Sequence, residues 1–183
     1  MKKRILVSNI IIILMLIISR PDNIILFYSG LPLIILGEMT RILSSASIRK
    51  NKELAKNGIY SATRNPLYFG TFLIMLGILI QLFSITHIFS TIFIYLITIV
   101  SFCIIYLKTI KAEEEFLLSR FGNEYKSYYE NTPVLIPDFK KINEFFKKEN
   151  FSKESFKKNK EYRGITGIIL IEIIIILKIW YIK

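Results

Sequence analysis

Two groups of side chains in this sequence could carry chemistry. The first is a polar stretch, residues 57–70, which holds Tyr60, Arg64, Asn65 and Tyr68 just ahead of an apolar segment. Pro66 suits the first turn of a helix, because its missing N–H would have no intrahelical partner there. The free N–H groups of that turn, at the positive end of the helix dipole, favour an anion or a carboxylate. A helix start with a snorkelling arginine and interfacial tyrosines is the simpler alternative.

The second group is Glu113-Glu114-Glu115, which follows the next apolar segment. On a helix, Glu113 shares a face with residues four and eight positions later, so we expect it to point toward the bundle and Glu115 toward water. An antiparallel hairpin of residues 67–85 and 88–107, joined by a short turn, would bring Arg64 beside these carboxylates. Two roles stay open for these residues. Glu114 and Arg64 could act in catalysis, or an arginine–glutamate ion pair could only link two helix ends at the membrane surface, where an exposed pair adds little stability.

The elements that must position these groups are helices in a membrane. The chain has 183 residues, is 52% apolar and carries a net charge of +11, with its charges between long apolar runs. Anionic lipid head groups are therefore expected as the counter-charge, and nucleic acid is not. We expect an all-α integral membrane bundle of about five transmembrane helices, with a central hairpin and a cytoplasmic amphipathic helix over residues 108–131. The expected spans are residues 5–18, 24–39, 67–85, 88–107 and 164–182.

Four smaller expectations accompany this layout. The basic start and first apolar run predict a retained span rather than a signal peptide, because no small-residue cleavage site follows. Residues 41–57 are expected to lie along the interface. Glu38 could face a site or mark the membrane boundary, whereas a mid-span Glu172 should face protein or be protonated. The single cysteine, Cys103, and the single histidine, His87, give no disulfide framework, no metal site and no base.

Lys and Arg are dense in residues 2–4, 41–64 and 108–163 and absent from the turn at His87. By the positive-inside rule, the N-terminus, the polar stretch and the glutamates then lie on the cytoplasmic side. We expect a membrane domain over residues 1–137 with a motif core at 54–137. A lysine-rich interfacial segment at 138–163 and a further transmembrane helix at 164–183 would follow it. Aromatic residues among the lysines of that segment would also fit a nucleic-acid strip, but its place between spans favours the interface.

The two groups also resemble a known pair of motifs. Gly58-x-Tyr60-x3-Arg64-Asn65-Pro66-x-Tyr68-x-Gly70 is similar to the G-x-Y-x3-R-H-P-x-Y-x-G pattern of isoprenylcysteine carboxyl methyltransferases and their phospholipid methyltransferase relatives. After the hairpin, Glu113-Glu114-x2-Leu117-x3-Phe121-Gly122-x2-Tyr125-x2-Tyr128, with Pro133 and Pro137, resembles the closing motif of the same families. The two motifs cover residues 54–137 in the right order.

The resemblance implies an integral membrane enzyme that uses S-adenosylmethionine at the cytoplasmic membrane face. It also implies a lipid-like or other hydrophobic acceptor and contact with membrane lipids. The cofactor-binding positions that it implies are Leu54, Ala55, Tyr60, Asn65, Pro66, Leu67, Tyr68 and Glu113.

Two positions depart from the family pattern. Asn65 stands where the families have histidine; an amide can still donate and accept hydrogen bonds, but it cannot act as an imidazole. Thr109 stands where isoprenylcysteine enzymes place a substrate-facing arginine, which weakens the case for a prenylcysteine carboxylate. Two other functions stay open: an NADPH-dependent membrane reductase of the steroid-reductase-like group, and a non-enzymatic scaffold or transporter subunit.

Overall fold

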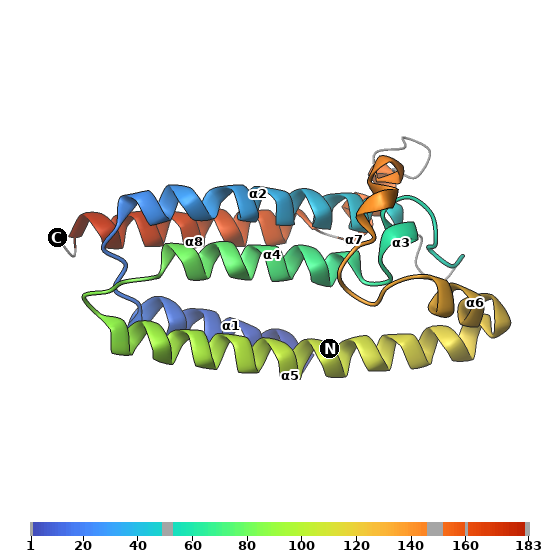
Figure 1. Cartoon of the computed structure of the whole chain (residues 1–183), viewed down its shortest axis with the longest axis horizontal. Coiled ribbons are helices and arrows are strands. Elements are labelled where there is room, and N and C mark those ends of the chain that lie inside the picture. The colour runs from blue at the N-terminus through green and yellow to red at the C-terminus, as the bar shows by residue number, and fades with distance from the viewer. Residues whose placement is uncertain (1, 49–52, 146–151, 160, 182–183) are drawn as a thin grey trace.

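The structure of the protein is a computed structural model that describes residues 2–48, 53–145, 152–159 and 161–181. Within these residues it is all-α, as predicted, and contains no strand (Figure 1). The elements in order are α1 (Lys2–Ile18), α2 (Ile24–Ser47), α3 (Ile59–Ala62), α4 (Pro66–Gln81), α5 (Ile88–Phe121), α6 (Asn123–Asn131), the 3₁₀ helix η1 (Phe139–Glu144), α7 (Lys153–Asn159) and α8 (Tyr162–Tyr181).

The closest packing in the bundle joins α2 and α4, which run antiparallel along most of their length (Figure 1). Glycines spaced seven residues apart on each helix make this contact: Gly30 lies against Gly77, and Gly37 lies against Gly70. A Cβ atom on Gly37 would stand 2.5 Å from the carbonyl oxygen of Gly70. In a bilayer the hydrophobic effect does not drive helices together, so helix pairs depend on close van der Waals packing. Small residues allow two helix backbones to approach closely enough for that packing.

The predicted hairpin is formed by α4 and α5, which are antiparallel and joined by a short turn at the left of Figure 1. The helices touch at the turn end, where the Tyr95 hydroxyl donates to the Leu79 carbonyl oxygen at 2.6 Å. They touch again near the opposite end, where the rings of Tyr68 and Tyr106 meet edge-on with centroids 5.1 Å apart. The principal partner of α4 is nevertheless α2, so the hairpin is more open than the tight pair that the short turn predicted.

Polar contacts hold α8 to the rest of the bundle. Gln81 of α4 donates to the Glu172 carboxylate at 2.8 Å, so Glu172 faces protein, as its mid-span position predicted. The Lys178 ammonium donates to the Leu16 and Ser19 carbonyl oxygens at the end of α1. A lysine there satisfies carbonyls that have no intrahelical donor.

Three helices in the described part of the chain are long and apolar enough to cross a membrane, namely α2, α5 and α8. Two shorter apolar helices, Leu6–Ile18 and Pro66–Gln81, accompany them. Apolar helices therefore stand at all five predicted spans, but α4 ends at Gln81, four residues before the predicted limit. The 34 residues of α5 extend for about 51 Å, well beyond a hydrocarbon core of about 30 Å, so one end of this helix projects past it.

Two further predicted boundaries were wrong. Residues 41–47, expected in an interfacial segment, continue α2 to Ser47; residues 49–52 of that segment lie outside the described chain. The amphipathic helix expected over 108–131 is divided at Gly122, which has φ +52° and so favours glycine. Residues 108–121 continue α5, and α6 then turns back over the end of the bundle.

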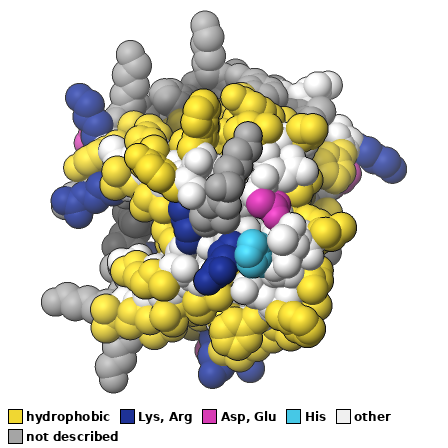
Figure 2. Space-filling view, turned by 90° about the vertical axis from the view of Figure 1, so that its left-hand side faces the viewer, with side chains coloured by type: hydrophobic (Ala, Val, Ile, Leu, Met, Phe, Trp, Pro, Cys, Tyr) yellow, Lys and Arg dark blue, Asp and Glu magenta, His cyan; other side chains and the backbone are white. Residues whose placement is uncertain are grey.

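Figure 2 shows the left-hand end of Figure 1, which is the end of the α4–α5 turn. Hydrophobic side chains surround a small polar centre there, in which the histidine lies beside an acidic and a basic side chain. The Ser84 hydroxyl donates to the Asp22 carboxylate at 2.6 Å and lies 3.4 Å from His87 Nδ1. His87 thus belongs to a turn, as expected, and lies at the opposite end of the bundle from Arg64.

Candidate functional site

The polar stretch folds into the short helix α3, an extended link and the start of α4. Pro66 occupies the first turn of α4, as its ring geometry predicted. The link is tied to the segment after α6: the Thr63 hydroxyl donates to the Leu135 carbonyl oxygen at 3.0 Å, and the Asn65 amide donates to that of Val134 at 2.9 Å. Asn65 therefore uses its donor to fix the backbone, which a histidine side chain would do with a different geometry.

Arg64 contacts both α5 and the end of α6 at this end of the molecule. Its Nε donates to Glu114 Oε1 at 2.9 Å, and the two side chains are only 9% and 17% exposed. Its Nη1 donates to the Tyr129 and Thr132 carbonyl oxygens at 2.6 and 2.7 Å. The guanidinium carbon lies 3.9 Å from the centroid of the Tyr129 ring. One planar cation thus joins α4, α5 and the end of α6, a task that suits arginine rather than lysine.

Glu113 and Tyr68 form the second link between α4 and α5. The Tyr68 hydroxyl donates to Glu113 Oε1 at 2.6 Å. Glu113 itself is exposed, and Glu114 is the more buried of the two. The helical spacing predicts Glu113 as the carboxylate that points inward, but in the structure Glu113 only reaches Tyr68 of α4 and Glu114 points inward instead. The Glu113 carboxylate still presents accepting positions to solvent, since a carboxylate offers about four. Glu115 is exposed, as expected.

Tyr60 lies buried behind this pair, and its carbonyl oxygen accepts a hydrogen bond of 2.7 Å from the Tyr128 hydroxyl. Burial raises the pKa of the Tyr60 phenol well above its usual value, and the nearby Tyr128 and Glu113 raise that pKa further. The phenol is therefore neutral at physiological pH and can only donate or accept a hydrogen bond. Its electrostatic neighbours show that Tyr60, Tyr68 and Glu113 share one region.

The structure thus brings six of the predicted site residues together at one end of the hairpin: Tyr60, Arg64, Asn65, Tyr68, Glu113 and Glu114. Pro66 and Leu67 lie in the first turn of α4, buried and partly buried. Leu54 is buried and Ala55 is partly buried in the segment that leads into α3. In the described part of the chain no group of three or more His, Cys, Asp and Glu side chains could hold a metal ion.

A second charged cluster beside this region was not predicted from the sequence. The Arg41 guanidinium donates to Glu161 and, at 2.6 Å, to the Thr71 hydroxyl, and Glu38 lies 3.9 Å from Arg41. Glu38 thus faces protein. A signal was present: Arg41 follows one apolar run and Glu161 precedes another, so opposite charges stand at the same membrane boundary.

One of three comparisons with known proteins gave a match. A model of the phospholipid methyltransferase family matches residues 33–124, which is half of the chain and includes both groups of polar residues. Neither the search of curated proteins nor that of solved structures gave a match. Helices long and apolar enough to cross a membrane fit such a family. The chain belongs to the phospholipid methyltransferase family.

Proposed function

We propose that this protein is an integral membrane methyltransferase that uses S-adenosylmethionine and acts on a lipid-like acceptor at the cytoplasmic membrane face. The observation that carries the proposal is the Tyr68–Glu113 hydrogen bond of 2.6 Å, because it joins the two predicted motifs at one end of the hairpin. Family membership supports the reaction class, and the apolar helices support a membrane location.

The residues at this end fit the proposed cofactor. When bound, S-adenosylmethionine supplies a methyl group that is already activated for in-line displacement. Glu113, exposed and with accepting positions unused, suits a cationic group of such a ligand. Tyr60, Asn65 and Tyr68 would frame the ligand with neutral polar groups. Leu54, Ala55, Pro66 and Leu67 would complete the site.

The work left to the protein is to position the acceptor and exclude water. A carboxylate or thiolate acceptor needs no base, whereas an amine or a phenol must lose a proton. Glu114 is the proposed base, because it is the carboxylate next to Glu113 on α5 and its side chain is only 17% exposed. Arg64 in turn donates to the carbonyl oxygens of Tyr129 and Thr132, which fixes the end of α6 beside Glu114.

The decisive test is calorimetry of S-adenosylmethionine binding to detergent-purified protein, with Glu113→Gln as the variant. Loss of the charge should weaken binding by roughly 10- to 100-fold, since a hydrogen bond to a charged group is worth about 1.5–3 kcal/mol. Glu115→Gln is the matched control, because this exposed glutamate is two positions along the same helix and should bind as wild type.

Other results would overturn the proposal. Unchanged binding in Glu113→Gln would remove Glu113 from the site. Saturable binding of NADPH without S-adenosylmethionine would favour the membrane reductase. Well-folded protein that binds neither ligand would favour the scaffold or transporter subunit, for which Glu38 and Glu172 would be the relevant carboxylates.

A further inference from the structure

Three large apolar side chains stand exposed in the short segment that follows α6. Val134, Ile136 and Phe139 are 44%, 67% and 62% exposed, and all three lie within residues 134–139. A single exposed apolar side chain is common on a protein surface, whereas several in one short segment indicate a surface that meets a partner.

The backbone of this segment is fixed against the link between α3 and α4. The Arg64 N–H donates to the Pro133 carbonyl oxygen at 2.9 Å, and the Asp138 N–H donates to the Ala62 carbonyl oxygen at 2.9 Å. Two side-chain hydrogen bonds from the link, described above, lie between these two. The exposed apolar side chains therefore stand at the level of residues 62–65, at the beginning of α4.

The length of α5 indicates where the hydrocarbon ends relative to that level. Residues 88–107 of this helix extend for about 30 Å, which equals the thickness of a hydrocarbon core of about 30 Å. The next residue, Lys108, is the first charged residue of α5. Tyr106 stands just inside this boundary, and its ring meets the ring of Tyr68 in the first turn of α4 at 5.1 Å. The beginning of α4 therefore lies at the membrane boundary.

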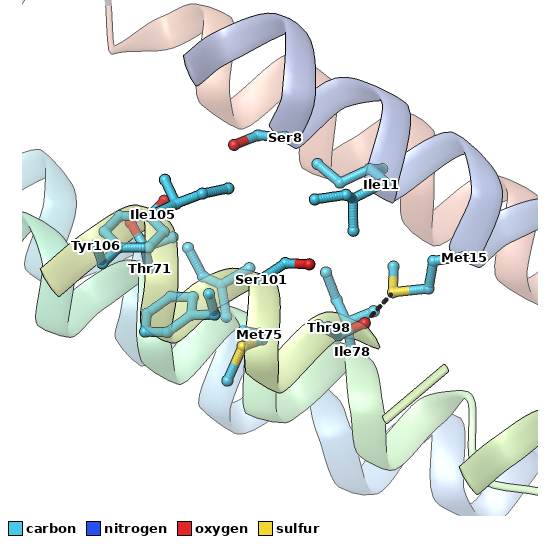
Figure 3. A pocket seen from close by; sticks show the side chains of 13 residues that line it. Ser8, Ile11, Met15, Thr71, Met75, Ile78, Thr98, Ser101, Ile105 and Tyr106 are labelled. Carbon is cyan, nitrogen blue, oxygen red and sulfur yellow. Dashed lines mark hydrogen bonds between the residues drawn. The ribbon is translucent and has the colours of Figure 1, made fainter. Parts of the chain in front are cut away.

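An apolar cleft between α1, α4 and α5 agrees with this boundary (Figure 3). The cleft has a volume of about 140 Å³, and Tyr106 and Thr71 stand at one end of it. None of the described side chains that line it carries a charge. Charged side chains are costly inside the hydrocarbon, so an uncharged wall up to Tyr106 fits a membrane boundary just beyond that residue.

Residues 133–139 thus lie just outside the hydrocarbon, within a head-group layer that is about 5–8 Å thick on each side. Helix α6 lies farther out, at the right-hand end of Figure 1. Basic side chains accompany the apolar ones: Lys140 is exposed, and the Lys141 ammonium donates to the Ser61 carbonyl oxygen at 3.1 Å. Asp138 is occupied locally, because its carboxylate accepts from the Lys140 N–H at 3.1 Å.

We infer that residues 133–141 dock onto the head-group layer of a bilayer that contains anionic lipid. The three apolar side chains enter this layer, as aromatic and aliphatic residues do at membrane interfaces, and the neighbouring lysines attract anionic head groups. The bilayer thereby holds the segment against residues 62–65. The inference goes beyond the proposed function, because such docking is independent of the reaction at the site.

The depth of the segment is measured by tryptophan fluorescence on a Trp180→Phe background, since Trp180 is the single tryptophan of the chain. Ile136→Trp and Phe139→Trp are compared in nanodiscs whose phosphatidylcholine carries bromine close to the ester groups. Bromine should quench both tryptophans several-fold more than that of Ser127→Trp, which stands on an exposed position of α6. Their emission should also lie further to the blue.

The charge of the surface is tested with the same reporters. Phosphatidylglycerol added to the nanodiscs should increase the quenching of Phe139→Trp. Lys140→Gln should reduce this increase, whereas Lys126→Gln removes an exposed charge of α6 and should not.

The effect on the site is tested by hydrogen exchange. The Arg64 and Asp138 amides should exchange several-fold faster in Ile136→Asp than in wild type, and Ser127→Asp is the matched control. Equal exchange in wild type and Ile136→Asp, in protein that elutes as wild type, would mean that the bilayer does not hold the segment in place.

Three fluorescence results would also overturn the inference. Quenching of Ile136→Trp no stronger than that of Ser127→Trp would place the segment in water. Blue emission without quenching would mean that protein, such as a second copy of the chain, covers it. Quenching that responds to neither phosphatidylglycerol nor Lys140→Gln would exclude an anionic surface. Wild type that fails to bind S-adenosylmethionine, with quenching intact in Ile136→Trp, would overturn the proposed function alone.

Discussion

At the scale of single residues, stability at the end of the bundle that holds the candidate site depends on which buried polar atoms have hydrogen-bond partners. The Tyr128 hydroxyl donates to the Tyr60 carbonyl oxygen at 2.7 Å. The hydroxyl of Tyr125, one helical turn earlier, is buried and has no hydrogen-bond partner among the described residues. A buried hydroxyl without a partner costs about 1–3 kcal/mol, so neighbouring tyrosines with the same chemistry contribute to stability with opposite sign.

This contrast predicts opposite effects of two matched substitutions. Tyr128→Phe should lower the free energy of unfolding by about 1 kcal/mol, because the Tyr60 carbonyl loses its donor. Tyr125→Phe should leave stability unchanged or raise it by about 1 kcal/mol, because it removes a desolvated hydroxyl. Thermal unfolding of detergent-purified protein measures both changes. An equal loss in the two variants would show that Tyr125 has a partner in solution.

The same tyrosines set the response to alkaline pH. Burial raises the pKa of the Tyr125 and Tyr128 phenols above the usual 10.0. Because the unfolded phenols ionise first as pH rises, the stability from these neutral groups is complete below about pH 10 and is lost above it. Tyr125→Phe should therefore make the melting temperature fall less between neutral pH and pH values above 10 than it does in the wild type.

Sequence patterns predicted which of these polar residues lie together better than they predicted the contacts between them. Residue type and spacing placed Tyr68, Arg64 and the glutamates at one end, because a hairpin brings its ends together. They did not show that Arg64 reaches Tyr129 and Thr132, since those bonds depend on the turn at Gly122. A positive φ angle at one glycine redirects α6, and periodicity alone does not reveal that angle.

At the scale of elements, the backbone contact between α2 and α4 is the rigid part of the bundle. The Cβ of an alanine at position 77 would stand 2.6 Å from Ile34 Cγ1 and 2.7 Å from the Gly30 carbonyl oxygen. The isoleucine could rotate away, but the carbonyl belongs to a helix and cannot. The seven-residue spacing of the glycines is visible in the sequence. The helix that they pack against is not, because the spacing on one helix does not show which other helix lies next to it.

Gly77→Ala should therefore separate the two helices and destabilise the protein by roughly 1–3 kcal/mol, as overpacking does. Gly167→Ala in α8 is the control, because a Cβ there would meet no atom within 4 Å. The control should be neutral or slightly stabilising, since alanine is the better helix former. Denaturant unfolding in detergent compares the two variants. Similar losses in both would show that α2 and α4 are less close than the structure has them.

At the scale of the whole molecule, charge joins segments that are distant in the sequence. Glu161 binds Arg41, and the Asn159 amide donates to the Ser45 carbonyl oxygen at 2.7 Å, so the segment before α8 is fixed to the end of α2. These contacts lie at the site end, and the Ser84–His87 turn lies at the other (Figure 1). The distribution of basic residues predicted which loops share an end of the bundle, because basic residues avoid translocation. It did not predict these pairings.

The proposed orientation has a direct test on a Cys103→Ser background. Thr86→Cys lies in the exposed turn after α4, and Ser127→Cys lies on an exposed position of α6. A membrane-impermeant maleimide should label Thr86→Cys in right-side-out vesicles and Ser127→Cys in inverted ones. The reverse pattern would place the site on the outer side, and labelling of both from one side would mean that α5 does not cross the membrane.

The glycine contact also bears on how the chain is made. Synthesis proceeds from the N-terminus, and all four glycines of the contact precede residue 82. The α2–α4 pair can therefore associate while α5 and α8 are still being translated. The later helices then pack against the α2–α4 pair. Helix α5 follows α4 through the turn at His87, and α8 is bound through the Gln81–Glu172 hydrogen bond. Nascent chains released after the turn at His87 should already contain this helix pair.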